Sequence, residues 1–396
     1  MREHEGAQVL YDRLRPLLVA SSTSSGTTTQ ILGPRYDPNA LVDKRPRVGV
    51  NYTSDGKFGV VRLDEGAPTN KAAWKRLTYS ENGDTNSTMV KINGSEYRFG
   101  ELNPGRDWVA GFKANDLKEP YYGRQSVFRF RNDDVDVTQY IQVVPGQTSA
   151  LDTVLIYYRV RNMGTVPRKV EMRLLLDTFI GDNDGVPFLV PGKSEMVRLA
   201  DLKDKEVPEY LEVIENPNDP KNPGTIVRLG LKGIRWGEVE PTEPGEVVIG
   251  QMGNARSWRP LDEKITNDSA VAVYWPEREV KPKEIKHYAI TYGLGSLEVS
   301  NDLGITAPGS VMPNRDFTVT GYVYKAKKGQ TVKLEVPAGM EIVDGADKTI
   351  AADSDRAQVF WTLRSKREGK YELNATTKGT QSKPLRIVVK SSSIFG

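Results

Sequence analysis

The stretch VDVTQYIQVV, residues 135–144, alternates apolar and polar side chains over most of its length. That alternation is typical of a strand that turns one face to a core and the other to water. The stretches VLIYYRV (154–160) and KVEMRLLL (169–176) have the same character, and the turn signal NMG (162–164) separates them. No helical pattern alternates with these strands, which excludes a parallel sheet of βαβ units. The sequence therefore predicts an all-β protein built from antiparallel sheets.

The strand pattern extends in both directions from this stretch and defines a first large unit. It begins near residue 48, and GLG (293–295) follows its last strand. Residues 200–245 are poorer in strand pattern, and the run NPNDPKNPG (216–224) contains three prolines. Because proline interrupts the hydrogen bonds of a sheet, we expect a surface excursion there. We predict one large antiparallel β-sandwich over residues 48–298.

A second unit with shorter strands follows. DFTVTGYVY (316–324) alternates cleanly, and AQVFWTL (357–363) and LRIVV (385–389) add further strands. About seven short strands in about 90 residues, with frequent turns, is the pattern of an immunoglobulin-like sandwich. The disulfide of that fold is missing, since the chain has no cysteine. We predict an Ig-like β-sandwich over residues 299–396.

The N-terminal segment, residues 1–47, is predicted to be an arm. Apolar residues recur at helical spacing from Ala7 to Leu18, and Pro16 is expected to end or kink this short helix. The Ser- and Thr-rich stretch 21–29 is typical of a flexible linker. Two interpretations stay open: a frayed terminal arm, or a helix that docks on a partner or a neighbouring subunit.

Composition excludes several classes of function. Fifty-five basic and 52 acidic side chains leave a net charge of +3, which argues against a dedicated nucleic-acid binder. The absence of cysteine excludes thiolate zinc sites and cysteine nucleophiles. Two histidines, His4 and His287, leave little room for a histidine metal site or a Ser-His-Asp triad. No stretch approaches the roughly 18 apolar residues of a transmembrane helix, and the N-terminus shows no signal peptide.

Three motifs carry a resemblance to a known family. They are LLLDTFIGDNDGVPF (174–188), SAVAVYW (269–275) and YGLG (292–295). Together they resemble uncharacterised bacterial β-supersandwich proteins, which are similar in outline to galactose-mutarotase-like domains and carry a trailing Ig-like module. The resemblance covers roughly residues 48–390, and it implies this fold and a location outside the cytoplasm or at the cell surface. Mutarotases use a histidine acid and a glutamate base, and this chain has no matching histidine pair.

The aspartate-rich string contains the sharpest candidate site. Asp177, Asp182 and Asp184 precede Gly185 in one short segment. Hard cations such as calcium bind several carboxylate and carbonyl oxygens that converge on one loop, and a glycine permits the turn. We therefore predict a metal site with Ca²⁺ as the candidate ion, although the spacing is not that of an EF-hand. The alternatives are a strand-to-loop corner, in which Asp and Asn side chains bond to nearby backbone amides, or a catalytic carboxylate.

Four aromatic residues are candidates for stacking on sugar rings: Trp236, Trp258, Tyr121 and Tyr122. The alternative is a place in the core or at a sheet edge, where large aromatic side chains are common. His287 lies in a predicted strand, where a lone histidine is expected to be exposed or hydrogen-bonded rather than catalytic.

The sequence leaves two functions open. The main prediction is a non-catalytic structural or interaction protein, of a bacterial surface or a protein assembly, that binds protein partners or assembles with itself. The scarcity of histidine and the absence of a phosphate loop or a G-x-S-x-G motif favour it, and argue against an enzyme. The alternative is a carbohydrate-binding or carbohydrate-active protein that uses the concave face of the larger sandwich. It rests on fold analogy and on the aromatic content.

Overall fold

The computed structural model describes residues 43–390, except for 54, 64–73, 102–112, 117–121, 131–132, 147–149, 194, 220–221, 236–238, 296, 298, 301 and 309. The predicted N-terminal helix and the Ser- and Thr-rich stretch lie outside the described residues. The described part of the chain contains no α-helix, and Asp204–Glu206 forms a short 3-10 turn. No helix in this part is long and apolar enough to cross a membrane. The prediction of an all-β fold is confirmed.

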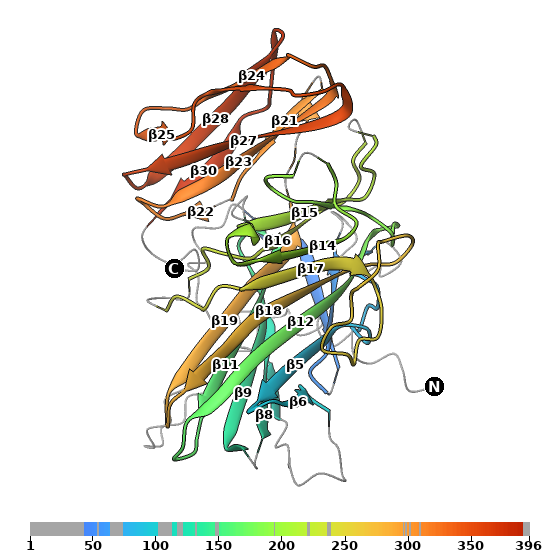
Figure 1. Ribbon diagram of the computed structural model, residues 1–396, viewed down its shortest axis with the longest axis vertical. Coiled ribbons are helices and arrows are strands. Elements are labelled where there is room, and N and C mark those ends of the chain that lie inside the picture. Colours follow the sequence, from blue (N-terminus) through green and yellow to red (C-terminus); the bar gives the residue numbers. More distant parts are fainter. Residues whose placement is uncertain are drawn as a thin grey trace.

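Two large sheets form the first sandwich (Figure 1). The eight-stranded sheet consists, from edge to edge, of β13 (Phe188–Leu189), β15 (Tyr210–Ile214), β16 (Ile226–Gly230), β19 (Ile285–Leu294), β11 (Thr153–Asn162), β9 (Val135–Val144), β8 (Gly123–Phe130) and β7 (Lys113–Asp116). The nine-stranded sheet consists of β14 (Ala200–Lys203), β17 (Glu246–Gln251), β18 (Ser269–Val280), β12 (Arg168–Gly181), β4 (Lys75–Thr78), β3 (Phe58–Arg62) and β2 (Val48–Tyr52), with β5 (Ser87–Ile92) beside β12 and β6 (Ser95–Arg98) beside β5. A separate parallel pair is formed by β1 (Asp43–Pro46) and β10 (Ala150–Leu151). The predicted strand 135–144 is β9.

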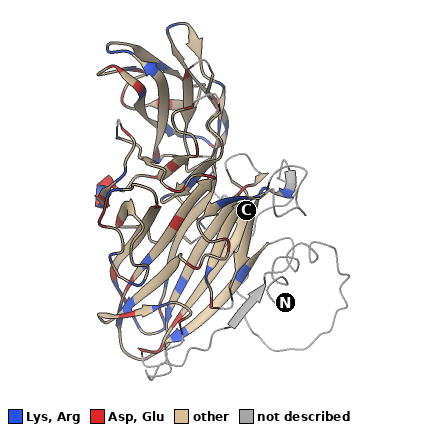
Figure 2. Ribbon diagram, turned by 90° about the vertical axis from the view of Figure 1, so that its right-hand side faces the viewer, with Lys and Arg blue, Asp and Glu red and all other residues tan. Residues whose placement is uncertain are grey.

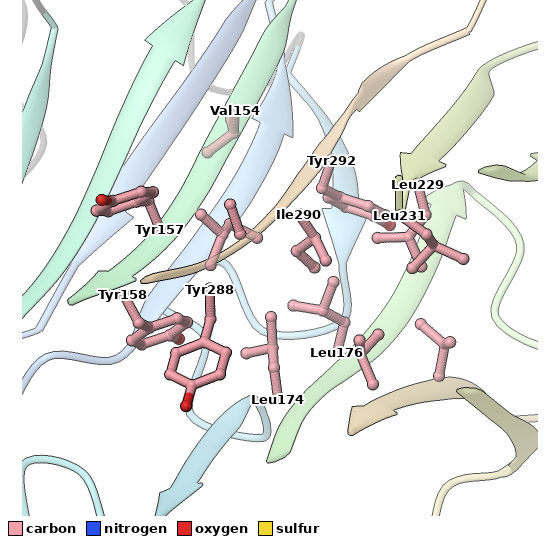
Figure 3. Close-up of a cluster of buried hydrophobic side chains, with 14 of the residues drawn as sticks. Val154, Tyr157, Tyr158, Leu174, Leu176, Leu229, Leu231, Tyr288, Ile290 and Tyr292 are labelled. Atoms are coloured by element: carbon pink, nitrogen blue, oxygen red, sulfur yellow. The ribbon is translucent and has the colours of Figure 1, made fainter. Parts of the chain in front are cut away.

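Apolar side chains fill the space between the two large sheets. Figure 3 shows Tyr158, Tyr288, Leu174 and Leu176 in this space, and all four are buried. Trp275 of β18 lies edge-on to the rings of Tyr158 and Tyr288. Burying one large apolar side chain stabilises a fold by about 1.5–3 kcal/mol. The face of each strand that carries the large apolar side chains therefore packs inside the sandwich.

Two smaller sheets form a second sandwich at one end of the molecule (Figure 1). One sheet consists of β20 (Val299–Ser300), β21 (Leu303–Thr306), β23 (Asp316–Ala326), β27 (Ser354–Ser365) and β25 (Met340–Ile342). The other consists of β22 (Ser310–Val311), β30 (Leu385–Val389), β28 (Gly369–Thr377), β24 (Thr331–Glu335) and β26 (Asp347–Thr349), with β29 (Thr380–Gln381) beside β28. Their core is a separate apolar cluster that contains the buried Trp361. The exact boundary near residue 298 and the Ig-like assignment stay predictions.

A buried polar network joins the two sandwiches, and we call it the junction network. Glu212 on β15 accepts hydrogen bonds from Arg228 Nη2 at 2.6 Å, and from the hydroxyls of Thr306 and Tyr322 at 3.1 Å each. Arg228 also donates to the Ala307 carbonyl. The Glu212 side chain is fully buried and that of Arg228 is 11% exposed. Because Thr306, Ala307 and Tyr322 follow residue 298, these bonds reach from one predicted module to the other.

Candidate functional sites

One face of the eight-stranded sheet carries polar side chains from three adjacent strands. Successive residues of a strand point to opposite faces, and directly paired residues of neighbouring strands point to the same face. Tyr140 pairs with Tyr157, and Arg159 pairs with both Thr138 and His287. Tyr158, the next residue along β11, points to the opposite face, and Tyr140, Tyr157 and Tyr158 all belong to the main core cluster. We call the following seven residues the polar face: Thr138, Tyr140, Gln142, Tyr157, Arg159, Arg161 and His287.

A hydrogen bond between Tyr157 and His287 lies at the centre of the polar face. The Tyr157 hydroxyl bonds to Nδ1 of His287, and the edge of the Tyr140 ring lies against Tyr157. Burial, followed by the charge of Arg159, lowers the pKa of His287 to about 4. Burial also raises the pKa of Tyr157 above its usual value. At neutral pH both groups are therefore uncharged, and one hydrogen bond joins the hydroxyl to the imidazole.

Two arginines of the polar face have buried nitrogen atoms for which the described part of the chain offers no acceptor. Nε and Nη1 of Arg159 and Nε of Arg161 are buried, and none of them has a hydrogen-bond partner among the described residues. Basic and acidic residues are otherwise interspersed over the strands and loops (Figure 2). Asp136, which lies opposite Arg161, pairs instead with Arg129 through two bonds of 2.5 and 2.7 Å. Because an unsatisfied buried donor costs about 1–3 kcal/mol, the two arginines suit an anionic ligand.

The stability of the fold should depend on pH through His287. Its pKa falls from 6.5 to about 4 on folding, so between these values the unfolded chain binds a proton that the folded chain does not. We expect the free energy of unfolding to fall by about 2 kcal/mol as the pH drops through this interval, with allowance for the partial exposure of the ring. Urea unfolding of the parent chain and of His287→Gln at pH 7 and pH 4 measures the difference. An unchanged pH dependence in the variant would contradict the expectation.

The aspartate-rich string folds into a turn at the end of β12, and only two of its three predicted ligands meet. Asp177 and Asp184 lie with Asp268, and one carboxylate oxygen of each is within 4.8 Å of the others. The Asp182 side chain is instead 86% exposed and lies 3.6 Å from Lys75. The prediction that Asp182 belongs to the site is therefore not supported by the geometry. Gly181, the last residue of β12, has a positive φ of 67°, a conformation that favours glycine, and Asp182 follows it directly.

Asp268 is the third member of this cluster. No pattern in the sequence links it to Asp177 and Asp184. It directly precedes β18, 84 positions after Asp184, and the antiparallel pairing of Asp177 with Ala270 brings it close. Burial raises the pKa of all three carboxyls, to about 7 for Asp177 and about 6 for Asp184. The charge of Asp268 adds to both of these shifts. The cluster is thus a place where negative charge is unfavourable without a cation or a shared proton.

The predicted aromatic residues do not form one site. Trp258 is half-buried against Tyr274 on the nine-stranded sheet, with Lys91 Nζ 4.0 Å from its ring centre. Tyr122 is half-buried against the main core, next to the eight-stranded sheet. Trp236 and Tyr121 lie outside the described residues. The residues that sequence reasoning missed are Tyr157 and Arg159, whose alternation with core residues gave no sign that their face is polar and enclosed.

No protein-family model matches the chain, and no curated protein matches it either. Among solved structures, it is similar to a galactose mutarotase-like protein from Lactobacillus casei, at 11% identity over 63% of this chain and 98% of that one, with a TM-score of 0.38. A galactose mutarotase related enzyme from Lactobacillus acidophilus is 11% identical over 64% and 96%, with a TM-score of 0.34. A polysaccharide lyase is 10% identical over 88% of this chain, with a TM-score of 0.32, and this chain spans about half its length (47%).

These names correct the main functional prediction. The chain was predicted to be a non-catalytic structural or interaction protein, and that prediction is wrong as the leading interpretation, because the similar structures are named as carbohydrate enzymes or their relatives. They agree with the alternative, a carbohydrate-binding or carbohydrate-active protein. At this level of identity the likeness concerns the fold and gives no residue of this chain a role.

Proposed function

We propose that the chain binds or transforms a carbohydrate on the polar face of the eight-stranded sheet, and that the sugar carries a carboxylate. The observation that carries the proposal is Arg159, whose buried Nε and Nη1 have no partner among the described residues. It lies beside the hydrogen-bonded pair Tyr157 and His287. A uronate would place its carboxylate against a guanidinium and its hydroxyls against neutral donors and acceptors.

The neutral state of His287 supports this chemistry. A neutral imidazole accepts and donates hydrogen bonds at once, as sugar hydroxyls do, whereas an imidazolium only donates. Tyr157 and His287 share a hydrogen bond along which a proton can move, so the pair is suited to general acid–base catalysis. Asp136 lies opposite Arg161 on the same face, but both of its carboxylate oxygens accept hydrogen bonds from Arg129, so it does not supply the pair of acid and base carboxylates that glycoside hydrolysis uses.

Burial indicates the side from which the ligand would approach. Tyr140 and Tyr157 are fully buried, whereas Arg159, Arg161 and His287 are only partly buried. The accessible part of the polar face is therefore its basic part. A ligand is expected to contact the arginines and the imidazole before it reaches the two tyrosines.

The proposal predicts that Arg159→Gln weakens the binding of a uronate oligosaccharide at least tenfold, because a charge-assisted hydrogen bond to a buried carboxylate is lost. Isothermal titration calorimetry of the full chain measures it, with the carboxyl-reduced neutral oligosaccharide as the second ligand. Arg129→Gln is the matched control: it removes a positive charge from the same sheet, but from an arginine already paired with Asp136. We expect this control to bind within about twofold of the parent.

Two results would overturn the proposal. One is equal affinity of the parent for the uronate and for its neutral counterpart, which would remove the role of the carboxylate. The other is equal loss of affinity in Arg129→Gln and Arg159→Gln, which would mean that general positive charge rather than the polar face attracts the ligand.

A further inference from the structure

Three carboxylates converge at the end of β12, on the other large sheet. Asp177 belongs to β12, Asp184 to the turn that follows it, and Asp268 to the residue before β18. One oxygen from each side chain lies within 4.8 Å of the other two. Asp177 is 1% exposed, whereas Asp184 and Asp268 are partly buried. The cluster therefore has a buried floor and a side open to solvent.

The buried carboxylate of Asp177 has one oxygen that no described residue bonds to. Oδ1 of Asp177 is buried and has no hydrogen-bond partner among the described residues, and the same is true of Oδ1 of Asp184 and of Asp268. Within the described part of the chain, none of the three forms an ion pair with a basic side chain. Buried carboxylates in proteins are normally paired, hydrogen-bonded or bound to a metal. A cation that all three carboxylates can reach would satisfy these oxygens.

Local packing brings the two loops together and holds them. A side chain at Gly185 would meet Asn267 Cα at 2.8 Å and the Thr266 carbonyl at 2.9 Å, so only glycine permits this approach. The backbone N–H of Ser269 donates to the Asp184 carbonyl at 3.0 Å, and the Ser269 hydroxyl bonds to the same oxygen. Asp184 and Asp268 are consequently fixed beside each other by the backbone and do not depend on flexible side chains.

We propose that Asp177, Asp184 and Asp268 bind a divalent cation, and that the cation is calcium. Calcium lies about 2.3–2.6 Å from each oxygen ligand, so two ligands of one ion are separated by no more than about 5 Å. The three oxygens lie within 4.8 Å of one another, inside that limit. Magnesium, at about 2.0–2.1 Å, demands a stricter octahedral geometry and usually keeps several waters, so a cluster of three protein carboxylates suits calcium better. The donors are all oxygen atoms, with no histidine or cysteine in the cluster, which disfavours zinc.

Arg76 is a basic group near the cluster, and its charge opposes the rise in the pKa of Asp184. Its guanidinium lies over the Phe179 ring at 3.7 Å and donates to the Tyr79 carbonyl at 2.8 Å. These contacts hold it beside the cluster without an ion pair to any of the three carboxylates. The net charge of the site with all carboxylates ionised remains negative.

The test is calcium binding by the full chain after removal of metals with EDTA. Isothermal titration calorimetry with CaCl₂ is expected to show one bound ion, and the midpoint of thermal unfolding should rise by about 3–5 °C at a calcium concentration of about one hundred times Kd. Asp177→Asn and Asp268→Asn should each weaken binding at least tenfold. Asp182→Asn is the matched control, since it removes a charge from the same loop but from a side chain that is 86% exposed and lies near Lys75.

Each outcome decides the proposal. Binding that Asp268→Asn weakens and Asp182→Asn leaves within twofold supports it, and Asp268 is partly exposed, so this variant is expected to fold. No heat and no shift of the parent at 10 mM calcium would overturn it and leave the cluster as carboxyls that share protons. Equal affinity for magnesium would overturn the assignment to calcium. Equal weakening by Asp182→Asn would show that the ion is attracted by the loop's total charge.

Discussion

Arg228→Met is expected to lower the free energy of unfolding by about 3–5 kcal/mol. The replacement removes the main counter-charge of Glu212, whose side chain is fully buried, and leaves that carboxylate without its bonds at 2.6 and 3.1 Å. Thr306 and Tyr322 would still donate to Glu212, but neither carries a charge. A buried, uncompensated carboxylate is among the most costly groups that a single replacement can create.

Urea unfolding, followed by tryptophan fluorescence, measures this loss, because Trp275 reports on the first core and Trp361 on the second. Arg364→Met is the matched control. Arg364 also donates to its carboxylate partner, Asp316, through Nε and Nη2, at 2.5 and 2.9 Å, but the two side chains are 39% and 44% exposed. We expect a loss of at most about 1 kcal/mol there.

The double replacement Glu212→Leu with Arg228→Met tests whether the loss of stability comes from the unpaired charge of Glu212. Replacing a buried ion pair by apolar groups of similar volume is often close to neutral, so the double variant is expected to be more stable than Arg228→Met alone. If both single variants and the double variant lost the same small amount, the junction network would not be a buried ion pair in solution.

Arg173→Met is expected to cost about 3 kcal/mol or more. Arg173 is fully buried on the nine-stranded sheet, and its guanidinium donates to Ser87 Oγ at 2.6 Å and to the carbonyls of Ala255 and Ser257 at 3.0 and 2.7 Å. Burial lowers the pKa of Arg173 to about 10, so it remains charged at neutral pH. Methionine would fill part of the volume but leave these acceptors without a donor.

The loss should be concentrated in the loop that Arg173 holds. Hydrogen exchange followed by mass spectrometry is expected to show faster exchange in residues 252–268 of Arg173→Met than in the strands of the second sandwich. Lys91→Met is the control, since Lys91 lies over the neighbouring Trp258 ring and makes its ion pair with Glu96 near the surface. Uniform acceleration across the whole chain would instead show that Arg173 supports the fold globally.

The sequence predicted the fold class because the strands with alternating patterns form the centres of the sheets. VDVTQYIQVV became β9, in the middle of the eight-stranded sheet. The strands were predicted least well in residues 200–245. These residues contain β14, β15 and β16, and β15 was not predicted because Glu212 interrupts its apolar run. In a single sequence a glutamate indicates an exposed position, because its partner is unknown. The partner of Glu212 is Arg228, which lies on the next strand of the sheet.

The candidate sites were predictable only in part, for a related reason. Asp177 and Asp184 were chosen because they are close in sequence, and Asp182 was included for the same reason. Asp268 is the third carboxylate because of the register between β12 and β18. That register cannot be read from a single sequence. His287 was expected to be exposed or hydrogen-bonded, and it bonds to Tyr157, 130 positions away.

The junction network also determines how the molecule reorients in solution. Two modules that share only a linker rotate independently, and the angle between them varies from moment to moment. Here Glu212 and Arg228 of the first sandwich bond directly to Thr306, Ala307 and Tyr322 of the second. The two sandwiches are thereby coupled in rotational diffusion, and anything attached to the second one is presented at a constant angle to the polar face.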